Sequence, residues 1–132
     1  MKKIIVLLAV VLMLTGCGEK EYFKQIYLED LKAYTEDGES GFILVVNENN
    51  QDFQEYVKNV AESEEVEINM YNVYQSAEGA QDNRPVVPFD GFDTFNELYY
   101  LENNEEKGSL EITAYEDMRL TEETKHFVDL HK

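Results

Sequence analysis

Reactive and metal-binding side chains are scarce in this sequence. Its 132 residues include one Cys, two His and no Trp. A chain with a single thiol forms no internal disulfide and carries out no dithiol redox chemistry of its own. The two histidines, His126 and His131, lie five positions apart, which is a poor spacing for one face of a helix. The sequence therefore predicts no zinc site.

Positive charge is scarce as well. Lys+Arg total 11 against 28 Asp+Glu, for a formal net charge of -17. A nucleic-acid partner is not expected, because its phosphates need Lys and Arg to neutralise them. Attraction to anionic lipid by charge is excluded for the same reason. The simplest interpretation is that surface carboxylates keep an extracytoplasmic protein soluble, although a basic protein, a cationic peptide or a divalent cation would also fit.

The longest apolar run stands at the start of the chain. Lys2 and Lys3 precede an apolar stretch over 4–14, which is shorter than the about 20 residues of a membrane-spanning helix. It ends in Leu-Thr-Gly-Cys17, which resembles a bacterial lipobox. That resemblance implies a signal peptide over 1–16, a lipidated tether over 17–20 with the lipid on Cys17, and a folded domain over 21–132. The alternatives are an ordinary secretory leader or an uncleaved anchor helix.

The resemblance also implies a location. Lipid on Cys17 would hold the protein at the extracytoplasmic face of the cell membrane.

A strand, a polar turn and a helix are predicted over residues 41–65. Phe42 to Val46 is a continuous apolar run, typical of a strand buried on both faces. Asn47 to Asp52 has turn composition, and Asn49 or Asn50 is expected to cap the helix that follows. A second strand over 66–74 would then pair parallel to the first through a crossover.

The remaining segments are predicted from periodicity. Apolar residues at three- and four-residue spacing indicate a helix over 21–36. Residues 75–93 read as a long loop, either functional or a poorly ordered insertion or an irregular short helix. Strands over 97–102 and 109–115 suggest an antiparallel hairpin, and a last helix is expected from Thr121, docking through Phe127, Val128 and Leu130.

Tyrosines are concentrated on the predicted strands. Because side chains alternate along a strand, these rings either form an exposed contact surface or are buried under helices on both sheet faces. Burial with the hydroxyls at the rim is the favoured interpretation for this group: Tyr71, Tyr74, Tyr99, Tyr100 and Tyr115.

The order of these elements resembles the thioredoxin-like fold. The run from Gly41 to Asn47, followed by Phe53-Gln-Glu-Tyr56, is similar to the first core strand and active-site helix of small bacterial thioredoxin-like proteins, including those of the bacteriocin-transport accessory type. Residues 97–112 are similar to their C-terminal hairpin. The resemblance implies an α/β three-layer sandwich over 21–132, with a parallel strand–helix–strand unit and a C-terminal antiparallel hairpin plus helix.

The chain departs from that family where its chemistry would lie. The CxxC motif would fall at Asn49, Asn50, Gln51 and Asp52, and the cis-proline near Asn96. Without the thiols there is no thiolate nucleophile and no mixed disulfide. The resemblance therefore implies a degenerate active-site loop, and no catalytic residue, cofactor or metal is expected. Oxygen-rich turns at 47–52 and 90–93 offer a weaker calcium hypothesis, but neither fits the EF-hand loop.

Together these patterns favour a lipid-anchored, non-catalytic protein- or peptide-binding module. Its partner would be an envelope protein or an exported polypeptide. The alternative is an accessory protein of a thiol-redox or bacteriocin transport or immunity pathway, without CxxC chemistry of its own.

Overall fold

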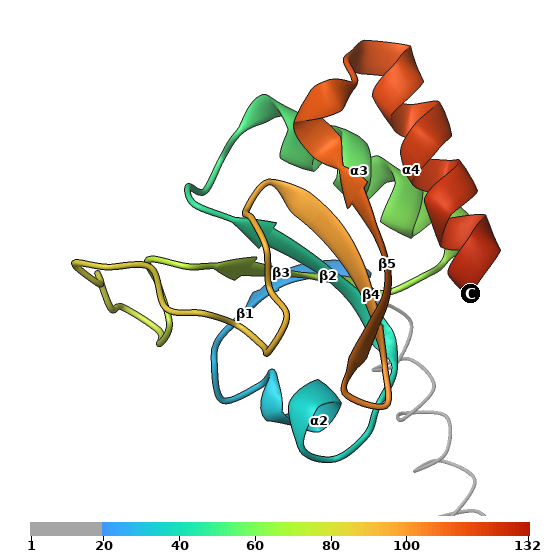
Figure 1. Ribbon diagram of the computed structural model, residues 1–132. Helices are drawn as coiled ribbons and strands as arrows, with labels where there is room; N and C mark the ends of the chain where they lie inside the picture. Colours follow the sequence, from blue (N-terminus) through green and yellow to red (C-terminus); the bar gives the residue numbers. More distant parts are fainter. Residues whose placement is uncertain (1–19) are drawn as a thin grey trace, which may run out of the picture.

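A five-stranded mixed sheet organises residues 20–132, the part of the chain that the computed structural model describes (Figure 1). The expected signal peptide and Cys17 lie outside these residues. The sheet order is β1-β3-β2-β4-β5, with β1 and β2 parallel to β3, and with β4 antiparallel to both β2 and β5. The strands are β1 (Phe23–Ile26), β2 (Gly41–Val46), β3 (Ile68–Asn72), β4 (Glu97–Glu102) and β5 (Glu105–Glu111).

The predicted strand–turn–helix–strand unit is confirmed. Strand β2 leads through the polar turn into helix α3 (Asp52–Glu64), and β3 pairs parallel to β2. Every residue of β2 from Phe42 to Val46 is buried, because helices and loops cover both faces of the central strands. The continuous apolar run in the sequence reflects this two-sided burial.

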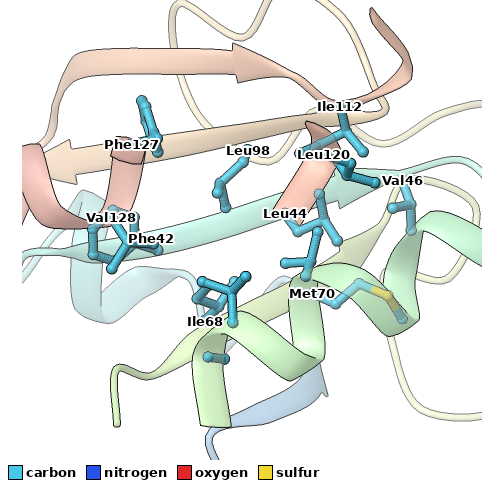
Figure 2. Close-up of a cluster of buried hydrophobic side chains, with 13 residues drawn as sticks. Phe42, Leu44, Val46, Ile68, Met70, Leu98, Ile112, Leu120, Phe127 and Val128 are labelled. Carbon is cyan, nitrogen blue, oxygen red and sulfur yellow. The ribbon is translucent and has the colours of Figure 1, made fainter. Parts of the chain in front are cut away.

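Helices α3 and α4 (Asp117–His131) cover one face of the sheet (Figure 1). Figure 2 shows the core that they enclose, in which Leu44 and Leu98 from adjacent strands lie between Ile68 on one side and Leu120 on the other. Helix α3 adds Val57, Val60 and Ala61 to this core. Phe127 and Val128 dock as predicted, but Leu130 is 66% exposed and the prediction for it was wrong.

The opposite face is covered by the short helix α2 (Lys32–Thr35) and the loop between β3 and β4 (Figure 1). Its core contains Leu31, Ile43 and Val45 together with two fully buried tyrosines, Tyr71 and Tyr99. Burial was the favoured prediction for the strand tyrosines, and it is confirmed for these two. Three others are only partly buried and pack against the two cores: Tyr74, Tyr100 and Tyr115.

The helix predicted over residues 21–36 is wrong. Residues 23–26 form the edge strand β1, and only 32–35 are helical. Phe23 and Ile26 are three positions apart, a spacing that suits one face of a helix but equally places side chains on opposite faces of a strand. Here Phe23 packs on the α3 side and Ile26 on the α2 side. Hydrogen bonding to β3 selects the strand.

The C-terminal elements also differ in their bounds. The hairpin is confirmed, but β5 begins at Glu105 instead of Ser109, because Asn103 and Asn104 alone form the turn. Residues 112–114 are a 3-10 helix (η1) instead of the end of a strand. Helix α4 begins at Asp117, four residues before the predicted Thr121.

The loop between β3 and β4 contains no helix, and it contributes to the core. The Val86 N–H donates to Val73 O at 2.7 Å, and the Tyr71 hydroxyl donates to Val86 O at 3.0 Å. Phe89 is buried, with its ring centroid 5.1 Å from that of Tyr99. The loop is therefore part of the layer that closes this sheet face, and the prediction of an insertion or an irregular helix was wrong.

Candidate functional site

The parallel strands β1, β2 and β3 all end at one edge of the sheet. The turn over residues 47–51, between β2 and α3, lies at this edge. In open α/β sheets, ligands bind outside the carboxyl ends of the strands, where the loops supply polar groups. Asn49 to Asp52, the four residues expected to form a degenerate active-site loop, are therefore placed where a binding site is expected.

Four amide side chains form a hydrogen-bonded cluster at this edge. Asn49 Nδ2 donates to Gln75 Oε1 at 2.7 Å, and Gln25 Nε2 donates to the same oxygen at 2.8 Å. Asn72 Nδ2 donates to Asn49 Oδ1 at 3.1 Å. Gln25 is the last residue but one of β1, Asn72 ends β3 and Asn49 follows β2, so the cluster links the ends of all three parallel strands.

The expected helix cap at Asn49 or Asn50 is wrong. Gln51 is the N-cap of α3 and makes no side-chain cap hydrogen bond. Asn49 is occupied by the amide cluster, and Asn50 adopts a left-handed backbone with φ of 62°. The turn is instead held by Gln54, whose Oε1 accepts from Asn50 N at 3.1 Å and whose Nε2 donates to Glu48 O at 2.8 Å.

Sequence reasoning missed Gln54, which is only 7% exposed. A signal was present, because Gln54 lies three residues before the buried Val57 and thus on the inner face of the helix.

A cavity of about 370 Å³ opens beside the cluster. Lys58 is its only basic lining residue, opposed by Asp52 and Glu55. A second cavity, of about 450 Å³, is also lined by Asn49, so that residue lies between the two. The lining of the first cavity contains no Cys, His or Ser: Phe23, Gln25, Asn49, Asn50, Gln51, Asp52, Gln54, Glu55, Lys58 and Met70. These groups can donate and accept hydrogen bonds, but they include no activated nucleophile.

Asn96, at the position expected for the cis-proline, lies at the same edge. Its N–H donates to Val45 O at 2.6 Å, which places it beside the end of β2. No cis peptide bond occurs within residues 20–132, and Asn96 has a left-handed backbone with φ of 61°. The structure thus brings Asn96 and residues 49–52 to one end of the same strand.

Two carbonyl oxygens at this edge are buried without a hydrogen-bond partner. They are Oδ1 of Asn96 and Oε1 of Gln51. The Gln51 amide is anchored through Nε2, which donates to Asn47 Oδ1 at 3.3 Å. Buried acceptors are almost always paired, so two unpaired ones at the same edge are unusual.

His131 has a packing role away from this edge, and His126 is exposed on α4. The His131 ring stacks on Tyr100 at a centroid distance of 4.8 Å and also contacts Phe127 at 4.7 Å. Within the described part of the chain, no three His, Cys, Asp or Glu side chains gather in a way that could hold a metal ion.

No helix within residues 20–132 is long and apolar enough to cross a membrane. Neither a scan against protein-family models nor a search of curated proteins finds a match to this sequence.

Proposed function

We propose that this protein is a lipid-anchored extracytoplasmic module that binds a polypeptide without catalysing a reaction on it. The binding surface is the amide-lined edge, defined as the amide side chains at the ends of the parallel strands: Gln25, Asn49, Gln51, Asn72, Gln75 and Asn96. The body would be a degenerate thioredoxin-like domain. This assignment is supported by the sheet order β1-β3-β2-β4-β5 and by the position of Asn49 to Asp52, which lead into the first turn of α3.

The observation that carries the proposal is the pair of unpartnered buried acceptors, Gln51 Oε1 and Asn96 Oδ1. An extended polypeptide presents a backbone N–H at every residue except proline, and these donors would satisfy such oxygens. Its carbonyl groups could accept from side-chain amides of the same edge. The absence of Cys, His and Ser from the cavity lining favours binding over reaction.

Photocrosslinking in cells tests this proposal on the full-length protein. A photoreactive residue at Asn50, on the rim of the edge, should trap one dominant protein. The same residue at Glu106, exposed on β5, is the matched control and should not trap it. Equal trapping from both positions, or from neither, would overturn the proposal.

A substitution at Asn96 tests the acceptor itself. Asn96→Gly removes the unpaired Oδ1 and keeps a residue that tolerates positive φ, so the fold should survive. We expect crosslinking from Asn50 to fall several-fold while the thermal unfolding midpoint stays within a few degrees of wild type. Unchanged crosslinking would show that the oxygen has no part in binding.

Lipid on Cys17 is the part of the proposal that follows from the leader alone. Cys17→Ser should move the protein from the membrane fraction to the soluble fraction and abolish labelling by a radioactive fatty acid. Retention of both would mean that another segment holds the protein at the membrane.

The alternative function is an accessory role in a thiol-redox or bacteriocin transport or immunity pathway. The net charge of -17 would suit a cationic bacteriocin as the bound polypeptide. A trapped neighbour with a dithiol motif would favour the redox pathway. A small cationic peptide, released by moderate salt, would favour immunity.

A further inference from the structure

Strand β1 forms one edge of the five-stranded sheet, and β5 forms the other. An edge strand can pair with a strand of another molecule unless charged side chains or proline block it. Four of the seven residues of β5 are charged, whereas Lys24 is the one charged residue among the four of β1. Strand β1 is therefore the less protected edge.

The backbone of β1 has hydrogen-bonding groups that face outwards. The Ile68 N–H donates to Tyr22 O at 2.8 Å, which fixes the phase of the parallel ladder between β1 and β3. In such a ladder the even-numbered residues of β1 direct their backbone groups towards β3, and the odd-numbered residues direct theirs away from it. The N–H and C=O groups of Phe23 and Gln25 therefore point to the side on which no further strand of residues 20–132 lies.

Cavities flank β1 on both faces of the sheet. On the α3 side, one of about 370 Å³ and one of about 430 Å³ are both lined by Phe23. On the α2 side, one of about 270 Å³ is lined by Lys24 and Ile26. Because side chains of a strand alternate between the two faces of its sheet, a strand added beside β1 would find space for them on both.

The charges around these cavities select the partner. Three lysines line the three cavities, against six carboxylates: Glu21, Asp30, Asp52, Glu55, Glu62 and Glu67. A segment with lysine or arginine side chains is complementary to this excess of negative charge.

A second copy of this chain is a poor partner for the same edge. In the antiparallel register that pairs Phe23 of one copy with Gln25 of the other, Lys24 lies directly opposite Lys24. Like charges in directly opposite positions destabilise a strand pair, and each copy also has a net charge of -17. Charge therefore favours a basic polypeptide over self-association.

We propose that β1 receives an extended segment of a basic polypeptide as a sixth strand of the sheet. The outward N–H and C=O groups of Phe23 and Gln25 pair with the backbone of that segment, and its basic side chains lie near the carboxylates on both faces. Gln25 also belongs to the amide-lined edge, so the added strand ends beside that surface. The inference rests on the proposed function, because it names the chemistry of the bound polypeptide and the way in which it is held.

Hydrogen exchange, followed by NMR on ¹⁵N-labelled full-length protein in a non-ionic detergent, tests the pairing. The probe is a heptapeptide of alternating lysine and threonine, blocked at both ends. At saturating peptide we expect exchange of the Phe23 and Gln25 amides to slow about tenfold, while the Lys24 and Ile26 amides, which face β3, change little. Absence of this alternating pattern would overturn the proposal.

Two control peptides separate backbone pairing from charge. The heptapeptide methylated on every backbone nitrogen keeps the charge but has no N–H donor, and it should give no protection. The heptapeptide with glutamate in place of lysine keeps the donors and should bind at least about fivefold more weakly. Protection by the methylated peptide, or equal binding of the acidic one, would overturn the proposal. Protection that appears without peptide and rises with protein concentration would overturn it too, because a second copy would then cover the edge.

A matched pair of variants isolates one outward donor. Gln25→Ala and Gln25→Pro both remove the side chain from the amide cluster, but only Gln25→Pro removes the outward N–H, a loss that an edge strand tolerates. We expect Gln25→Pro to bind the lysine–threonine heptapeptide about fivefold more weakly than Gln25→Ala, the usual effect of one hydrogen bond. Equal affinities of the two folded variants would overturn the proposal. If Gln25→Pro does not fold, the methylated peptide decides the same question.

Crosslinking in cells separates failure of this inference from failure of the proposed function. A photoreactive residue at Lys24, which is exposed on β1, should trap the same protein as one at Asn50. Trapping from Asn50 alone would overturn strand addition and leave polypeptide binding at the amide-lined edge standing. Trapping from Lys24 alone would support strand addition and overturn the amide-lined edge as the binding surface.

Discussion

At the scale of single residues, buried tyrosine hydroxyls connect the sheet to the long loop. The Tyr99 hydroxyl donates to Thr94 O at 2.6 Å, and its oxygen accepts from Thr94 N at 3.1 Å. The Tyr71 hydroxyl donates to Val86 O. Each ring thus fills the core while its polar atom pairs with a loop that has no regular hydrogen bonding of its own.

This arrangement predicts alkaline sensitivity. Burial raises the pKa of Tyr71 to about 12, with a smaller contribution from Asp82. The folded state therefore keeps a proton that the unfolded chain releases near pH 10, so the contribution of Tyr71 to the free energy of unfolding is constant below about pH 10 and falls as pH rises from 10 towards 12. The pKa of Tyr99 is also raised by burial, which adds to the fall. Urea unfolding measured at a series of pH values checks this expectation.

The matched variants are Tyr71→Phe and Tyr115→Phe. Tyr71→Phe should cost about 1 kcal/mol at neutral pH, because Val86 O loses its donor, yet its decline above pH 10 should be shallower than that of the wild type. Tyr115 packs at the margin of the other core, and Tyr115→Phe should keep the wild-type decline. Identical slopes for Tyr71→Phe and the wild type would contradict the prediction.

At the scale of elements, the β4–β5 hairpin is set by a two-residue turn. Asn103 and Asn104 have φ of 53° and 66°, so both adopt the left-handed backbone that a type I′ turn requires. Asn tolerates this conformation better than other residues with a Cβ, which explains why β5 can begin directly at Glu105. The expected six-residue link was too long because it counted charged residues as loop.

We expect Asn104→Gly to stabilise the protein by about 0.5 kcal/mol, because glycine adopts positive φ without strain. Asn104→Ala should destabilise it by about 1 kcal/mol for the opposite reason. Urea denaturation of the three proteins gives both values. Equal stability of the Gly and Ala variants would show that the turn does not determine the hairpin.

At the scale of the whole molecule, the acidic surface opposes folding. The net charge is -17, and within residues 20–132 only a few ion pairs offset it, among them Lys132 with Glu64 at 3.5 Å and with Asp129 at 3.2 Å. The pair with Glu64 ties the C-terminal Lys132 to α3, whereas the pair with Asp129 lies within the last turn of α4; both are at least partly exposed and individually weak. Repulsion among the remaining carboxylates is the larger electrostatic effect.

Sodium chloride should therefore stabilise the protein. Raising the ionic strength from about 0.01 to about 0.5 M shortens the screening length from ~30 Å to well below 10 Å, and we expect the free energy of unfolding to rise by about 1 kcal/mol. Urea, which is uncharged, is the denaturant for this measurement. A fall in stability with salt would mean that the local ion pairs outweigh the general repulsion.

The sequence by itself determined the elements whose signals are local. Four features were predicted: the apolar run of β2, the polar turn after it, the amphipathic α3 and the β4–β5 hairpin. Their signals are burial on two faces, helical periodicity and turn composition, which depend only on residues close together in the sequence. The parallel pairing of β2 and β3 followed from the crossover rule. Asn49, Asn50 and Gln51 lie directly before α3, and Asp52 is its first residue.

Tertiary structure decided what depends on partners distant in the chain. Residues 23–26 are a strand only because β3 lies beside them, since their apolar spacing suits a helix equally well. Gln25 and Gln75 are hydrogen-bonded although they are fifty positions apart in the sequence, and Tyr34 and Asn69 are 35 positions apart. No local sequence pattern could therefore predict the amide cluster or the contacts on the α2 side of the sheet. The unpaired oxygens of Gln51, Asn69 and Asn96 likewise exist only in the folded chain, because burial without a partner is a property of packing.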